Sequence, residues 1–234
     1  MFPGRRLRSN PLDILWRHAL GYTPDFLNQV GGPVGWVRWG HRAVQYLDQL
    51  EIPKKQKYAV LSPKFELRVN RSFEQVVRCC ASARVSWISP ELIAGLLQLH
   101  RMGYAHSFET WSGGELAGGY FGIQLGGLVT IHSGFHRVSN AGRAAFGRAM
   151  LLLRDRGFKF VDVATVPKHM VNFGSVWIPQ WKFEAEIRQV IQQRPTITDG
   201  VVCPPVPWPI RWGFPAVRIA RSLHRHWPEG TSGR

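Results

Sequence analysis

The order of apolar and polar positions predicts secondary structure most clearly in the middle of the chain. Residues 65–69 alternate between apolar and polar side chains, which is typical of a half-buried strand. Apolar positions at helical spacing over 73–80, after Ser72 as N-cap, predict a helix. Ser89 opens a second helix, whose apolar positions between 92 and 99 face inward and which ends at Gly103.

The following 80 residues predict a sheet with one long helix. We expect strands at 105–111 and 116–123, joined by a turn at Ser112-Gly113-Gly114, and further strands at 128–133 and 158–163. A basic helix is expected at 140–156, and residues 173–183 are expected to close the sheet region. A hairpin meander followed by helix and strand indicates an α+β fold with helices against a mixed sheet.

Both ends of the chain have weaker patterns. We expect short helices between Pro11 and Gln49, broken by glycines, and then a basic loop with Lys54, Lys55 and Lys57. After Arg194 the chain is rich in proline, and we expect irregular structure there with one short basic helix near 216–224. These changes suggest a small N-terminal domain (1–61), a central domain (62–194) and a basic tail (195–234).

Charge and cysteine content narrow the class of protein. The 234 residues contain 30 Lys and Arg but 15 Asp and Glu, a formal charge of +15 that favours a polyanionic partner such as nucleic acid. The three cysteines, Cys79, Cys80 and Cys203, form no CxxC pair, so neither a disulfide framework nor a zinc site is expected. No apolar run approaches the roughly 18 residues that span a bilayer. We expect a cytoplasmic, monomeric protein without a membrane partner.

A set of motifs resembles one known family. In order they are Trp87-Ile88-Ser89, Leu99-His100-x-x-Gly103-x-Ala105-His106-Ser107-x-Glu109-x-Trp111, Gly118-Gly119-x-x-Gly122, Phe135, Arg137-x-x-Asn140-Ala141, Val161-Asp162, His169 and Gly174. This series resembles the leucyl/phenylalanyl-tRNA–protein transferases over about residues 69–183. The His-Ser-x-Glu-x-Trp run followed by two glycines is the most specific part.

The resemblance implies an acetyltransferase-like (GNAT-type) fold, with a small N-terminal domain and without metal or organic cofactor. It further implies transfer of Leu, Phe or sometimes Met from aminoacyl-tRNA to a protein whose N-terminal residue is Arg or Lys. The α-amine of the acceptor would attack the ester that joins the amino acid to the terminal adenosine. The partners would be the acceptor arm of the tRNA and the acceptor protein.

The family pattern also indicates candidate site residues. Asp162 matches the family's Asp and would accept or orient a proton of the attacking amine, although a strand-end carboxylate also commonly caps a turn. An apolar pocket would hold the transferred side chain and would discriminate only modestly between apolar residues. Its candidate lining, much of which we expect to be core, is Trp87, Trp111, Tyr120, Phe121, Phe135 and Phe173.

Two basic segments are candidates for tRNA phosphates. They are the connector with Lys54, Lys55 and Lys57, and the region with Arg137, Arg143, Arg148 and Arg154. Contacts of this kind carry no sequence information but make binding strongly salt-dependent. The alternative is a solvated cationic surface.

The chain departs from the family at two motif positions. His132 stands where the family has Glu, and Ala164 stands where it has Gln. A neutral His132 could accept a proton near pH 7, but it could not attract an Arg or Lys side chain. The sequence therefore leaves open a transferase with a different amine acceptor, or an impaired, RNA-binding relative. Glu109, His106 and His169 match family positions, and we expect them to be structural.

Overall fold

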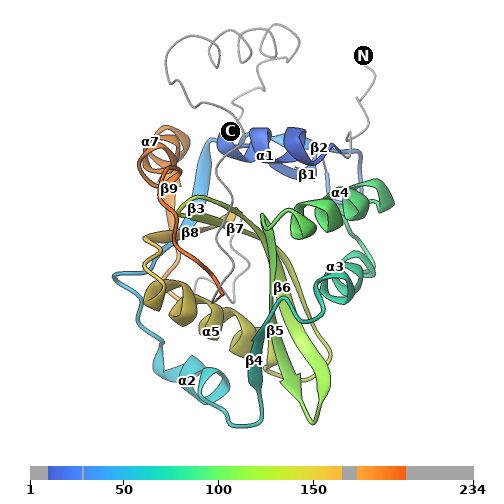
Figure 1. Ribbon diagram of the computed structural model, residues 1–234, viewed down its shortest axis with the longest axis vertical. Coiled ribbons are helices and arrows are strands. Elements are labelled where there is room, and N and C mark those ends of the chain that lie inside the picture. Colours follow the sequence, from blue (N-terminus) through green and yellow to red (C-terminus); the bar gives the residue numbers. More distant parts are fainter. Residues whose placement is uncertain (1–9, 28, 165–172, 199–234) are drawn as a thin grey trace, which may run out of the picture.

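The computed structural model describes residues 10–27, 29–164 and 173–198. Predictions for His169, Cys203 and most of the tail lie outside these residues. Figure 1 shows a central sheet with helices on both sides. The helices are α1 (Pro11–Ala19), α2 (Lys54–Val60), α3 (Phe73–Ala81), α4 (Pro90–Arg101), α5 (Ala141–Asp155) and α7 (Gln180–Val190). The strands are β1 (Thr23–Phe26), β2 (Val34–Val37), β3 (His41–Tyr46), β4 (Glu66–Val69), β5 (Ala105–Ser112), β6 (Glu115–Leu125), β7 (Leu128–His136), β8 (Phe160–Ala164) and β9 (Val176–Pro179).

Within the described residues, the main sheet has seven strands in the order β4-β5-β6-β7-β8-β3-β9. Strands β7 and β8 are parallel, and all the other neighbours in this sheet are antiparallel. The α5 helix connects β7 to β8, as a parallel pair requires a crossover. The α+β fold with a mixed sheet and flanking helices, which the sequence predicts, is confirmed.

Each face of the sheet buries its own apolar core. On one face, side chains of α1, α3, α4 and α7 pack against residues such as Phe121 and Phe160. On the other face, α5 packs against residues such as Tyr120 and Val161. Side chains alternate between the faces along a strand, so residue parity decides which layer of helices a side chain meets. The same alternation determines which of the candidate site residues share a face of the sheet.

The central elements agree with the sequence prediction. Ser89 caps α4, where its hydroxyl accepts the backbone N–H of Leu92 at 3.2 Å. The turn between β5 and β6 uses Gly113 and Gly114 at positive φ, which suits glycine. Ser72 precedes α3, but its side chain makes no capping bond. Instead its backbone N–H donates to the buried carboxylate of Glu109 at 2.7 Å.

The N-terminal segment differs from the prediction. After α1 the chain forms strands rather than short helices: β1 and β2 pair as a small antiparallel sheet, and β3 joins the main sheet. Residues 54–60, expected as a loop, form α2. The strand β3 lies between β8 and β9, so residues from before position 61 complete the main sheet. The three-part domain division stays a prediction.

Candidate active site

A buried ion pair lies where three strands meet. Val44 of β3 and Thr130 of β7 are both in register with Asp162 of β8. Arg42, two residues before Val44, reaches across to Asp162 with its Nε and Nη2 atoms. Arg42 and Asp162 are almost completely buried, at 1% and 0% exposure. Away from water, each of these two opposite charges is stabilised by the other.

The carboxylate of Asp162 has four donors. Its Oδ1 accepts from Arg42 Nε at 3.3 Å and from the backbone N–H of Ala164 at 2.8 Å. Its Oδ2 accepts from Arg42 Nη2 and from the hydroxyl of Thr130 at 3.1 Å. An ionised carboxylate has about four acceptor positions, and all of them are used here. For Asp162 to take a proton from a substrate amine, one of these donors must first leave.

One nitrogen of Arg42 is unpaired among the residues that the structure describes. Its Nη1 is buried and has no hydrogen-bond partner there. The guanidinium also lies over the ring of Phe183 from α7, at 4.9 Å from the ring centroid. A buried, unpaired donor costs free energy unless a ligand or water satisfies it, so this N–H is available to an oxygen atom of a substrate.

Two histidines meet on the same face of the sheet. His132 follows Thr130 by two residues on β7, and its Nε2 lies 2.8 Å from Nε2 of His18 on α1. His18 Nδ1 lies 2.7 Å from the carbonyl oxygen of Ile14, which can only accept, so this Nδ1 carries a proton. A neutral His18 therefore accepts at Nε2, and His132 must donate from Nε2. The lone pair of His132 is thereby assigned to Nδ1.

The surroundings keep both histidines neutral. Burial lowers the pKa of His18 to about 4, and the positive charge of Arg42 adds to this effect, while the bond to Ile14 and the charge of Asp162 oppose it. Burial also lowers the pKa of His132 well below 6.5, with further contributions from His18 and Arg42. Near pH 7 His132 is thus an uncharged, weak proton acceptor.

Aromatic rings enclose this histidine pair. Trp87 and Phe121 each have ring centroids 5.9 Å from that of His132, and Trp36 lies edge-on to His18 at 5.3 Å. Two of the six predicted pocket residues, Trp87 and Phe121, thus contact His132. We call Arg42, Thr130, Asp162, His18 and His132 the polar cluster.

The other predicted pocket residues lie elsewhere. Tyr120 and Phe173 belong to the core on the α5 face, where both pack against Phe146. Their exposed fractions are only 7% and 1% because both lie within this core. The alternation of β6 turns Tyr120 to the face opposite that of Phe121. Trp111 donates from its indole N–H to Glu109, and Phe135 packs beside Arg137. The structure brings none of these four to the polar cluster.

Comparison with known proteins identifies the family. The family model described as leucyl/phenylalanyl-tRNA protein transferase matches residues 44–188. This chain belongs to that family. A leucyl/phenylalanyl-tRNA–protein transferase of Gloeobacter violaceus is 35% identical over 75% of this chain and 90% of its own length. One from Rubrobacter xylanophilus is 37% identical over 69% and 85%. The solved structure of FemX matches 69% of this chain and 65% of that chain, at 9% identity and a TM-score of 0.47.

The two positions at which the sequence is expected to depart from the transferase family pattern lie at the polar cluster. His132 is held by His18. Ala164 adopts a left-handed conformation with φ of 55°, and its N–H donates to Asp162. Such a conformation is unfavourable for a residue with a Cβ atom. The hydrogen bond to Asp162 helps to hold the backbone in this conformation.

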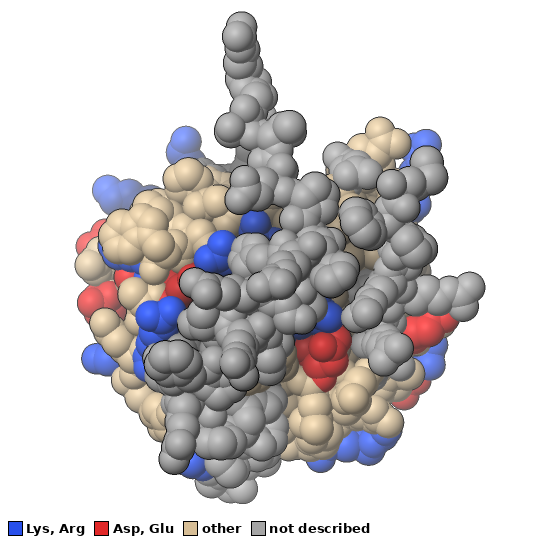
Figure 2. All heavy atoms as spheres, turned by 90° about the horizontal axis from the view of Figure 1, so that it is seen from above, with Lys and Arg blue, Asp and Glu red and all other residues tan. Residues whose placement is uncertain are grey.

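The predicted basic residues of this transferase family member fall into two groups. Lys54, Lys55, Lys57, Arg143 and Arg154 are exposed on α2 and α5, which pack against each other, and Arg137 is exposed after β7. Arg148 is different, because it donates to three backbone carbonyls between α2 and β4. On the face shown in Figure 2, Lys and Arg lie at several places with acidic residues among them, not as one patch.

The sequence alone did not point to His18 or Thr130. His18 is a single histidine in an amphipathic helix, and its partner lies 114 residues away. Arg42 had a weak signal, since Arg42-Ala43-Val44 resembles an Arg-Ala-Val element of the transferase family. Among the described residues, no group of three or more His, Cys, Asp or Glu side chains could hold a metal ion. In the same part of the chain, no helix has the length and apolar character to cross a bilayer.

Proposed function

We propose that this chain transfers leucine, phenylalanine or methionine from aminoacyl-tRNA to the N-terminal α-amine of an acceptor protein in the cytoplasm. The matched region, 44–188, contains His132, Thr130 and Asp162 of the polar cluster. One observation supports a working rather than an inactive site. His132 is held neutral, with its lone pair at Nδ1, beside a buried ion pair and an aromatic wall.

In the proposed reaction, the acceptor amine attacks the carbonyl carbon of the aminoacyl ester. A C–N bond forms, and the carbonyl electrons move onto oxygen. Once the C–N bond forms, the attacking nitrogen is positively charged and acidic, so that even a weak acceptor such as His132 Nδ1 can take its proton. When the C–O bond to the ribose breaks, the leaving oxygen receives that proton, and the products are a new amide and a free ribose hydroxyl. His132 ends in the state in which it began.

Arg42 and Asp162 have supporting roles in this proposal. The unpaired Nη1 donor of Arg42 is suited to the negative charge that develops on the carbonyl oxygen. Asp162 holds Arg42 by two hydrogen bonds and so fixes the direction of that donor. Asp162 thus positions a group rather than carrying a proton.

A second candidate differs in the acceptor. Position 132 has no negative charge, and the charge of Asp162 is compensated by Arg42. A cluster without uncompensated negative charge gives no electrostatic advantage to an acceptor that begins with Arg or Lys. We therefore propose, as the alternative, an acceptor whose first residue is uncharged.

A transfer assay tests both candidates. Labelled Leu-tRNA or Phe-tRNA is mixed with peptides that differ only in a first residue of Arg, Lys or Ala. We expect transfer by the wild-type chain, a roughly hundred-fold lower kcat for His132→Ala because the proton acceptor is lost, and unchanged affinity for tRNA. His132→Glu should raise the preference for Arg and Lys over Ala.

The outcomes separate the candidates. Wild-type transfer to Arg and Lys peptides alone would support the family's acceptor, and equal or better transfer to the Ala peptide would support the uncharged one. Absence of transfer to every peptide, together with tight binding of tRNA, would refute the transferase proposal and leave an RNA-binding relative.

A further inference from the structure

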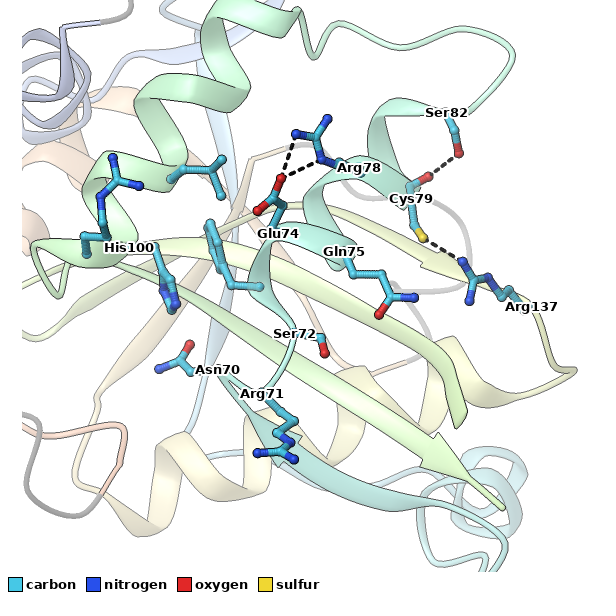
Figure 3. Close-up of a pocket in the computed structure, with 13 residues that line it drawn as sticks. Asn70, Arg71, Ser72, Glu74, Gln75, Arg78, Cys79, Ser82, His100 and Arg137 are labelled. Atoms are coloured by element: carbon cyan, nitrogen blue, oxygen red, sulfur yellow. Dashed lines mark hydrogen bonds and ion pairs between the residues drawn. The ribbon is translucent and has the colours of Figure 1, made fainter. Parts of the chain in front are cut away.

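A groove runs along the outer side of α3. It has a volume of about 760 Å³. Three segments besides α3 contribute to it: the β4–α3 turn, the end of α4 and the residue that follows β7. Figure 3 shows Arg78 and Glu74 on α3, Arg137 beside Cys79 at one end, and His100 at the other. Nothing in the proposed transfer chemistry accounts for this groove.

The groove is strongly basic. Its lining includes four arginines, Arg71, Arg78, Arg101 and Arg137, but one acidic residue, Glu74. Glu74 pairs with Arg78, and Arg137 donates to the sulfur of Cys79 at 3.1 Å. In the part of the chain that the structure describes, no hydrogen bond or ion pair engages Arg71 or Arg101, and both are exposed. Two guanidinium groups are thus free for an anionic ligand.

The side chains that line the groove favour a sugar–phosphate backbone over an anionic lipid surface. Ser72 and Gln75 provide neutral hydrogen-bonding groups between the arginines, whereas the Asn70 amide is bound to His106 and Ser107 and the Ser82 hydroxyl donates to the carbonyl of Cys79. Phe73 is 3% exposed and stacks on His100 at 4.2 Å, so it offers no free ring face to a base. Guanidinium and hydroxyl groups without an exposed aromatic platform suit a sugar–phosphate backbone. They do not suit a lipid surface, which would require exposed apolar side chains.

The groove lies one helix layer from the polar cluster. Phe73 lines the groove and contacts Phe121, with ring centroids 6.5 Å apart, and Phe121 contacts His132. Arg137 follows the strand β7 that carries His132. A strand of RNA bound along α3 would therefore lie on the same side of the sheet as His132, separated from it by these two buried rings.

We propose that this groove binds backbone phosphates at the 3′ end of the acceptor arm of aminoacyl-tRNA, through Arg71, Arg78, Arg101 and Arg137. The proposal rests on the proposed function for the identity of the RNA. It adds a binding surface on α3 and α4 to the basic residues of α2 and α5.

Equilibrium binding of uncharged tRNA at several salt concentrations tests the groove. The test variant is Arg71→Gln with Arg101→Gln. The control variant is Lys159→Gln with Arg194→Gln, which removes the same charge from exposed positions outside the groove. We expect several-fold weaker binding for the test variant than for the control. Its slope of log K against log salt should fall by about 1.4, because each phosphate contact on a single strand contributes roughly 0.7.

Equal affinity and equal slope for the two variants would overturn the proposal that this groove binds RNA phosphates. So would a test variant that keeps its affinity for tRNA but loses affinity for vesicles of anionic lipid. The transfer assay with the wild-type chain is independent of this comparison. If the wild-type chain transfers the amino acid and both variants bind tRNA equally, only the proposal that the groove binds RNA is rejected. If the test variant binds tRNA more weakly but the wild-type chain shows no transfer, only the proposed transferase function is rejected.

Discussion

The contact between His18 and His132 joins two imidazole rings through Nε2 atoms 2.8 Å apart, and one of these atoms must carry the shared proton. The carbonyl of Ile14 decides which one, because it requires the proton of His18 on Nδ1. The tautomer of His132 thus depends on a helix that contributes no other group to the polar cluster. A carboxylate at position 132 would need no such partner, since both of its oxygens can accept.

Substitution of His18 tests this control of the tautomer. In His18→Leu nothing accepts the Nε2–H of His132, and the ring can take the other tautomer or turn. We expect kcat for transfer to fall roughly ten- to hundred-fold, because a misplaced base loses part of the roughly 10²–10⁴-fold that a well-placed one contributes. His18→Gln offers an amide oxygen to His132 and should keep most of the activity. The measurement is kcat for both variants, with tRNA affinity as the control.

An equal loss in the two His18 variants would show that His18 only fills space. The pH profile gives a second readout. Wild-type kcat should show no ionisation of His132 near 6.5, because its surroundings lower the pKa of this group well below that value. A step near 6.5 in His18→Leu alone would show that the imidazole of His132 had gained access to water.

At the scale of elements, Arg148 joins α5 to the segment between α2 and β4. Its Nε donates to the carbonyl of Val60 at 2.6 Å and its Nη2 to that of Ser62 at 2.7 Å, and its Nη1 donates to the carbonyl of Phe65. Burial lowers the pKa of this guanidinium, although it remains charged at neutral pH. These carbonyls, from the last residue of α2 to the residue before β4, have Arg148 as a common partner, so α2 and its lysines depend on it for their position.

Arg148→Ala should therefore destabilise the fold rather than remove a phosphate contact. We expect a loss of about 2–4 kcal/mol in the free energy of unfolding, since three carbonyls lose a charged donor. Arg143→Ala, on the exposed side of the same helix, should change it by less than about 0.5 kcal/mol. Urea denaturation measures both. If the Arg148→Ala variant is as stable as the wild type but binds tRNA more weakly, Arg148 contributes to RNA binding rather than to the fold.

The sequence predicted elements well where one pattern was clear. The strands from β5 to β7, and α3 to α5, follow regular spacing and glycine turns. The strand β3 escaped prediction because it is buried on both faces: Ala43 and Val44 are both fully buried, so its sequence does not alternate. Contacts such as Arg42 with Asp162 join positions 120 residues apart, and only the sheet order brings them together.

For the whole molecule, the buried histidines make stability depend on pH. Burial lowers the pKa of His106 to about 4, as it does for His18. In the unfolded chain both would titrate near 6.5. Between pH 6.5 and 4 the unfolded state therefore binds more protons than the folded state. The free energy of unfolding must fall as the pH decreases through this range, and it is independent of these two groups above about pH 7.

Replacing one buried histidine should remove its share of this dependence. His106 accepts a hydrogen bond from the Asn70 amide at 3.0 Å through Nδ1, and the side-chain oxygen of His106→Asn can take the same place. From pH 7.5 to 5 we expect the variant to lose about 2 kcal/mol less stability than the wild type, the linkage free energy of one such group. His136→Asn, at an exposed position, is the control variant. Urea denaturation at both pH values measures the difference. If the wild type and the two variants lose the same free energy of unfolding, His106 is protonated in the folded state as readily as in the unfolded chain.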